Sequence, residues 1–154
     1  MRLQALTFVA VGLLIAAISR AELSAQDDAA QKDLQKLQGD WTMLKGEEDG
    51  KSLPDEVIKN SKLTVKGDKH DARLDKDVYL GKLKLDPTQN PKALTTSDTE
   101  GRFAGKTMLG IYKIEEGRFT VCSAPPGKDR PKQFSTETGT GHILLVWKRK
   151  TDGK

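Results

Sequence analysis

The sequence predicts a mainly β protein, a closed antiparallel barrel of about eight strands with a short N-terminal helix. Three observations favour this fold class. Short segments in which apolar and polar residues alternate follow one another along most of the chain. Glycine, proline and aspartate separate these segments at close intervals. About eight short strands in one sheet lose their exposed edges when the sheet closes on itself, which favours a barrel.

The first residues of the chain are predicted to form a secretory signal peptide. Arg2 supplies a positive start, and residues 5–18 are almost uninterruptedly apolar. Small residues suited to cleavage follow at 19–21 and again at 23–25. The alternative is an uncleaved membrane anchor, but an apolar stretch of about 14 residues is shorter than the roughly 20 that a span requires. We therefore expect cleavage of residues 1–25 and an exported protein, periplasmic or secreted, whose domain covers residues 26–154.

A single amphipathic helix is predicted over residues 27–37. Asp27 and Asp28 suit its N-terminal end, where carboxylates meet the positive pole of the helix dipole. Ala30, Leu34 and Leu37 recur at helical spacing and form one apolar face. In a closed barrel, such a helix is expected to cover one open end.

Four strands and a helical turn are predicted between residues 41 and 85. Turns at Asp49-Gly50 and Gly67-Asp68 separate the segments. The expected elements are strands 41–45, 62–66, 70–74 and 78–85, with helical turns at 54–59. The alternation of apolar and polar residues predicts which side chains share one face of each strand. These sets are Leu63 with Val65, Ala72 with Leu74, and Tyr79 with Gly81, Leu83 and Leu85.

The second half of the chain predicts four more strands and one long loop. The strands are expected at 93–96, 106–114, 118–123 and 142–149. The turn Glu115-Glu116-Gly117 joins the middle two as a hairpin, because glycine is available for positive φ. Residues 124–141 are rich in proline and glycine and form the one long irregular segment. Irregular loops of that length are often functional.

Short motifs along residues 34–149 resemble one known family. They include Leu37-x-Gly39-x-Trp41, Asp49-Gly50-Lys51-x-Leu53-Pro54, Leu63-Thr64-Val65-Lys66-Gly67-Asp68, Leu85-Asp86-Pro87, Pro91-Lys92-Ala93, Leu109-Gly110-Ile111-Tyr112, Cys122-x-Ala124-Pro125-Pro126-Gly127, Arg130-Pro131-x-x-Phe134 and Gly141-His142-x-Leu144-Leu145. The family is a lipocalin-like group of small domains, found mainly in predicted extracytoplasmic planctomycete proteins, with no assigned function. The resemblance implies a barrel and nothing about a ligand. Residues 70–73 and 95–98 are more polar than the family pattern, so frayed or short strands are expected there.

The resemblance also implies a structural set of three residues. In lipocalin-type barrels, a tryptophan in a Gly-x-Trp motif plugs the closed end, and a basic residue of the last strand lies over it. Gly39 and Trp41 match the motif. Arg149 fits the basic position because a guanidinium stacks well on an indole.

Five residues are candidates for contact with a ligand. Tyr79, Tyr112 and Phe119 lie on predicted strands and either line a cavity or fill the core. Arg130 and Phe134 place a charge and a large apolar group on the long loop. The alternative for this pair is that Phe134 packs down and Arg130 pairs with a nearby carboxylate.

Several classes of chemistry lack the residues they need. The formal net charge of +4 falls to +3 without residues 1–25, and the lysines are scattered among acids, which argues against nucleic-acid binding. Cys122 is the only cysteine, so no internal disulfide is possible, and we expect a buried thiol. His70 and His142 have no ligand spacing for zinc. Acid pairs such as Glu47-Glu48 fall in turns and are expected to be solvated.

The sequence therefore predicts an exported, non-enzymatic domain, with neither metal nor cofactor, that binds a small, partly apolar ligand in its barrel. We expect a monomer without a membrane span after signal cleavage. The alternative is a filled barrel that acts through its surface as an interaction module of the cell envelope. Its contact zone would be the long loop and the basic stretch 148–150. An apolar void above about 300 Å³ would favour the first hypothesis and a packed interior the second.

Overall fold

The computed structural model describes residues 10–151, with side chains from residue 20 onward. In this part of the chain, nine antiparallel strands and two helices form one unit. The helices are α1 (Ala10–Leu37) and α2 (Asp55–Asn60). The strands are β1 (Gly39–Glu48), β2 (Lys51–Ser52), β3 (Lys62–Lys66), β4 (Lys69–Leu74), β5 (Asp77–Asp86), β6 (Ala93–Glu100), β7 (Thr107–Glu115), β8 (Arg118–Ser123) and β9 (Ile143–Arg149).

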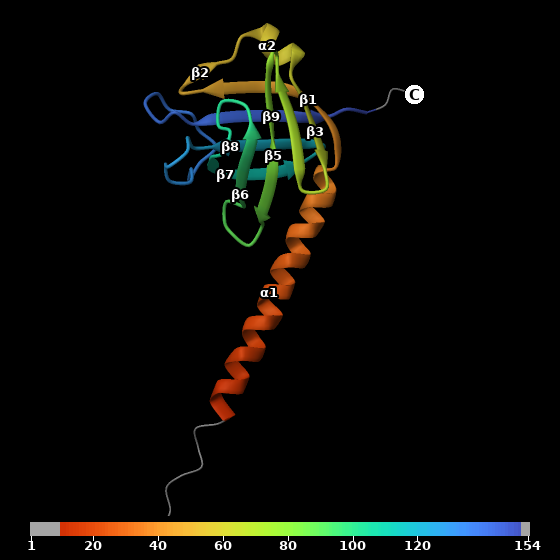
Figure 1. Ribbon diagram of the computed structural model, residues 1–154, viewed down its shortest axis with the longest axis vertical. Helices are drawn as coiled ribbons and strands as arrows, with labels where there is room; N and C mark the ends of the chain where they lie inside the picture. Colours follow the sequence, from red (N-terminus) through yellow and green to blue (C-terminus); the bar gives the residue numbers. More distant parts are fainter. Residues whose placement is uncertain (1–9, 152–154) are drawn as a thin grey trace, which may run out of the picture.

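Eight of these strands close into a barrel, which confirms the predicted fold class. Each strand pairs with the next from β3 to β9, and β1 pairs with both β3 and β9. The closing ladder between β1 and β9 runs from Trp41 opposite Arg149 to Glu48 opposite Ile143. The remaining strand, β2, has two residues and pairs with the far end of β1. Figure 1 shows the barrel with α1 projecting from one end and α2 lying at the other.

A β-bulge at Leu44 interrupts the closing ladder. Met43 faces Trp147 and Lys45 faces Val146, so Leu44 has no partner on β9. Its side chain turns outward and is 44% exposed. A bulge bends its strand and increases the local twist. The first half of β1 accordingly pairs with β3, and its second half leads to β2.

The helix α1 is longer than the predicted segment 27–37. It begins at Ala10 and runs through the predicted leader without a break, because alanine and leucine in that stretch favour helix. Acidic residues such as Asp27 and Asp28 mark a common helix start, but they are tolerated inside a helix. Only the C-terminal end of α1 enters the barrel, where Leu37 is fully buried. No helix within residues 10–151 is both long enough and apolar enough to cross a membrane.

The two polar segments form complete strands, so the expectation of frayed or short strands there was wrong. β4 covers the first segment with six residues, and β6 extends to Glu100, past the predicted end at residue 96. Each strand pairs with a neighbour on both sides. Backbone pairing on both edges therefore holds these strands despite their polar composition.

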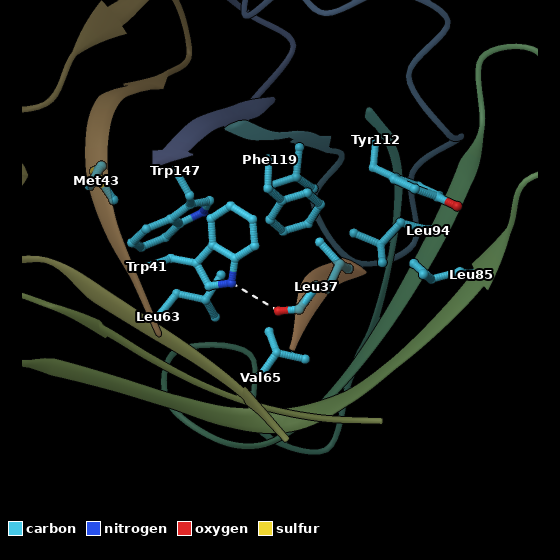
Figure 2. Packing of buried hydrophobic residues seen from close by; sticks show 11 residues of the cluster. Leu37, Trp41, Met43, Leu63, Val65, Leu85, Leu94, Tyr112, Phe119 and Trp147 are labelled. Carbon is cyan, nitrogen blue, oxygen red and sulfur yellow. Dashed lines mark hydrogen bonds between the residues drawn. The ribbon is translucent and has the colours of Figure 1, made fainter. Parts of the chain in front are cut away.

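The buried apolar residues pack together inside the barrel, with Leu37 from the end of α1 among them (Figure 2). They come from the last turn of α1 and from strands around the whole barrel, and the cluster comprises Leu37, Trp41, Met43, Leu63, Val65, Leu85, Leu94, Tyr112, Phe119, Val121 and Trp147. A second, smaller cluster of Ile111, Cys122 and Leu144 lies on the opposite face of β7, β8 and β9. The barrel therefore has a packed interior at one end and a covered patch on its outer wall.

Candidate functional site

The plugged end of the barrel is organised around Trp41. The Cζ atom of Arg149 lies 4.3 Å from the centre of the indole ring, and the indole Nε1 donates a hydrogen bond to Leu37 O at 2.9 Å. Arg149 also donates to Gln38 O at 2.6 Å and to Lys36 O. These bonds satisfy carbonyls that the end of α1 leaves without partners. Gly39 enters this junction with φ +104°, a value that other residues rarely adopt.

A cavity of about 150 Å³ opens at the other end of the barrel. Its surface is largely apolar. Strands from all sides of the barrel and the loop between β6 and β7 contribute the lining residues, which include Leu53, Ala72, Leu74, Leu83, Leu94, Phe103, Met108, Val121, Ile143, Leu145 and Trp147. Because the α1 end is closed, a ligand can reach this cavity only from the open end.

Of the five residues predicted to contact a ligand, Tyr79 and Phe119 line the cavity. Phe119 also belongs to the core, with its ring centre 6.1 Å from that of Trp41. Tyr79 is half-buried, and burial, followed by the nearby charge of Asp77, raises the pKa of its hydroxyl. The phenol therefore stays protonated and available as a donor at neutral pH.

Tyr112, a third predicted contact residue, does not line the cavity. The side chain is 1% exposed and fills the core, and its hydroxyl donates a hydrogen bond to Asp33 Oδ2 at 2.8 Å. Lys92 Nζ lies 2.7 Å from the same oxygen, and Lys36 binds the other. Burial alone would raise the pKa of Asp33, but the hydrogen bonds from Lys92, Tyr112 and Lys36 outweigh it and hold the pKa below 3.8. Tyr112 thus fastens α1 to the barrel.

The loop residues Arg130 and Phe134, the other two predicted contact residues, also lie outside the cavity lining. Phe134 packs on the outer-wall cluster of Ile111, Cys122 and Leu144. Arg130 Nη1 donates to Leu94 O and Gly110 O, each at 2.5 Å, and so binds backbone carbonyls of β6 and β7 rather than a carboxylate.

The far end of the long loop is fastened as well. Asp49 Oδ1 accepts hydrogen bonds from the backbone N–H groups of Gly139 and Gly141, at 2.7 and 2.8 Å. These bonds lower the pKa of the Asp49 carboxyl. Thr136 is buried, and its hydroxyl donates to Glu47. The loop is therefore an ordered strap on the outer wall, and not a cover over the cavity.

An ion pair stands at the mouth of the cavity. Arg102 Nη2 lies 2.5 Å from Glu48 Oε1, and the guanidinium Cζ lies 4.5 Å from the ring centre of Phe103. The hydrogen bond with Glu48 raises the pKa of Arg102. The sequence placed Glu48 among solvated turn acids, whereas it ends β1 and lines the cavity. Only the closure of the barrel brings it beside Arg102.

The cavity wall also holds a buried pair that sequence reasoning missed, His70 and Asp98. His70 Nε2 lies 3.2 Å from Asp98 Oδ1, and both side chains are almost fully buried. The sequence did contain a sign that His70 points inward, because His70 alternates in phase with the inward residues Ala72 and Leu74. The residues that the structure describes contain no cluster of three or more potential metal ligands around this pair or elsewhere.

The fold and the site define a closed antiparallel barrel with one plugged end and one apolar cavity, a lipocalin-like architecture. Comparison of the chain with protein-family models, curated proteins and solved structures finds no match.

Proposed function

We propose that this chain is an exported, non-enzymatic binding protein for a small, partly apolar molecule, and that it belongs to the lipocalin-like family that its motifs resemble. The observation that supports this function is the apolar cavity with a single open end. A concave, mostly apolar pocket with a few polar groups is the usual form of a small-molecule site. Export rests on the leader-like residues 1–25.

The volume of the cavity limits the size of the ligand. Its volume of about 150 Å³ is half of the roughly 300 Å³ at which pockets for drug-sized ligands begin. An engineered cavity of about 150 Å³ in another protein takes up benzene. The ligand is therefore a molecule of about that size, or a longer one that leaves its remaining atoms in the mouth beside Glu48 and Arg102.

Titration with toluene tests this function directly. We expect a saturable change in the fluorescence of Trp147, which lines the cavity. Ala72→Leu, which adds atoms to the cavity wall, should abolish the change, whereas Ala29→Leu on α1, outside the cavity, should not. Failure of the wild-type chain to bind toluene and every other aromatic probe of that size, at any accessible concentration, would refute the proposal.

The surface hypothesis remains the second candidate, because the cavity is small and large side chains fill the plugged end. In this hypothesis the strap, residues 124–141, and the basic stretch 148–150 contact an envelope protein. A pull-down from envelope extract that yields one saturable partner, together with negative titrations for all such aromatic probes, would favour it. N-terminal sequencing of the exported protein tests the leader separately, and an intact Met1 would contradict cleavage.

A further inference from the structure

The strand register shows how His70 and Asp98 come together. His70 on β4 faces Gly81 on β5, and Gly81 in turn faces Asp98 on β6. The strands β4 and β6 are therefore about 10 Å apart, twice the spacing of neighbours. The two side chains must reach toward each other across β5, and they do so on the inner wall that lines the cavity.

Gly81 provides the space for this contact. A Cβ atom at Gly81 would lie 2.8 Å from His70 Cε1 and 2.3 Å from Ser97 O, both closer than real contacts allow. The imidazole therefore occupies the place of a side chain on β5. Three strands contribute to one arrangement, so the pair is a built feature of the wall rather than a chance meeting of two polar residues.

The polar atoms of this wall are not satisfied by the protein. His70 Nδ1, Asp98 Oδ1 and Thr96 Oγ1 are buried and have no hydrogen-bond partner among residues 10–151. The 3.2 Å contact between His70 and Asp98 is close, but its atoms are not aligned as a hydrogen bond. Buried polar groups in native proteins almost always have partners. Since Thr96 precedes Asp98 by two residues on β6, its side chain points to the same face, and all three residues line the cavity.

The chemistry of these atoms selects the partner. A carboxylate only accepts, a neutral imidazole offers one donor and one acceptor, and a hydroxyl offers both. A ligand hydroxyl complements this set, because it donates to Asp98 or His70 and accepts from Thr96. A ligand carboxylate would bring a second negative charge beside Asp98 in a poorly solvated interior, where like charges repel strongly.

We infer that the cavity binds a small apolar molecule through a single hydroxyl group, an alcohol or a phenol, held by His70, Asp98 and Thr96. This inference rests on the proposed binding function and adds the class of ligand. The apolar walls hold the hydrocarbon part, whose size is limited to about that of a benzene ring by the volume of 150 Å³.

A comparison of phenol with toluene tests the inference. The two molecules have nearly the same shape, and a purely apolar cavity favours toluene because phenol must give up the hydration of its hydroxyl. We expect calorimetric titration of the wild-type chain to give at least tenfold tighter binding of phenol. Equal affinities, or a preference for toluene, would overturn the hydroxyl assignment and leave the binding function intact. No binding of either probe would refute both.

Two further probes test the charge of the ligand. Benzoate should bind at least tenfold more weakly than phenol because of Asp98. Benzylammonium tests whether the wall instead recognises a cation through the same carboxylate. Tighter binding of benzylammonium or benzoate than of phenol would overturn the inference.

Matched variants test whether the polar residues of the cavity wall cause the preference for phenol over toluene. Thr96→Val is nearly isosteric, and it should lower the ratio of phenol to toluene affinity at least threefold while toluene still binds. His70→Phe should do the same. Thr120→Val is the control, because Thr120 alternates with the inward residues Phe119 and Val121 and does not line the cavity. An unchanged ratio in Thr96→Val and His70→Phe, or an equal fall in Thr120→Val, would contradict the assignment.

A measurement on the wild-type chain avoids any effect of substitution on folding. The sequence has two histidines, His70 and His142, and His142 lies outside the cavity. With ¹⁵N-labelled histidine, phenol should shift the ring nitrogen resonances of His70, whereas toluene should leave them nearly unchanged. The resonances of His142 should not move. Identical His70 shifts with both probes would overturn the contact.

Discussion

The plug formed by Trp41 lends itself to a quantitative prediction, the effect of Trp41→Ala on the free energy of unfolding. The indole is 1% exposed, contacts Phe119, and lies under the guanidinium of Arg149. Truncation of a buried aromatic residue to alanine costs about 3–5 kcal/mol. This cost includes the hydrogen bond that the indole donates to Leu37 O. At about 3 °C per kcal/mol for a domain of this size, Tm should fall by roughly 9–15 °C.

Urea unfolding followed by circular dichroism measures this effect, because the change in midpoint at constant slope gives the change in stability. Trp41→Phe separates the contributions, since it keeps an aromatic ring and removes the hydrogen bond to Leu37, a loss of about 1–2 kcal/mol. Leu44→Ala is the control, because Leu44 lies on the bulge with an exposed side chain, and it should cost less than about 1 kcal/mol. A loss below about 1 kcal/mol in Trp41→Ala, or an equal loss in Leu44→Ala, would refute the reasoning.

Three further predictions concern the rest of the molecule. Asp33→Asn should lower the free energy of unfolding near neutral pH. The difference in stability from wild type should shrink as the pH falls below 3.8, because a carboxyl with a lowered pKa stabilises the fold only while it is ionised. Equal stability differences in urea titrations at neutral and acidic pH would contradict this. Phe134→Ala should lower the free energy of unfolding by about 2 kcal/mol, roughly half the value for a fully buried ring. It should also increase the rate of limited proteolysis within residues 124–141, and an unchanged cleavage rate would argue against the strap. Cys122 should react with a thiol reagent far faster in urea than in the folded chain, because it is fully buried and burial raises its pKa; similar rates would contradict the buried assignment.

The alternation of apolar residues predicted the strands well, because the period of two is a local property of the backbone. Leu63 and Val65 are buried on β3 as expected, and Leu85 is buried on β5. The resemblance to lipocalin-like barrels further implied that Arg149 lies over Trp41, as the structure has it. The bulge at Leu44 and the two-residue strand β2 left no such signal.

The contacts of the long loop could not be read from the sequence. Arg130 and Phe134 occupy an irregular segment, where side-chain direction follows no period. Arg130 binds carbonyls of β6 and β7, and Phe134 covers Cys122 on the outer wall. Which face of the sheet a loop covers depends on where the loop docks, and that is decided only when distant strands are in place.

The sequence by itself determined the strand pattern, which follows from local periodicity, and the number of short strands favoured a closed sheet. The plug of Trp41 and Arg149 was implied by the resemblance to lipocalin-like barrels. The tertiary structure alone decided the size of the cavity and the pairing of His70 with Asp98 across Gly81. These features depend on the register of three strands and on the volume left after packing. Register and packed volume are properties of the assembled sheet, because each depends on side chains that lie far apart in the chain.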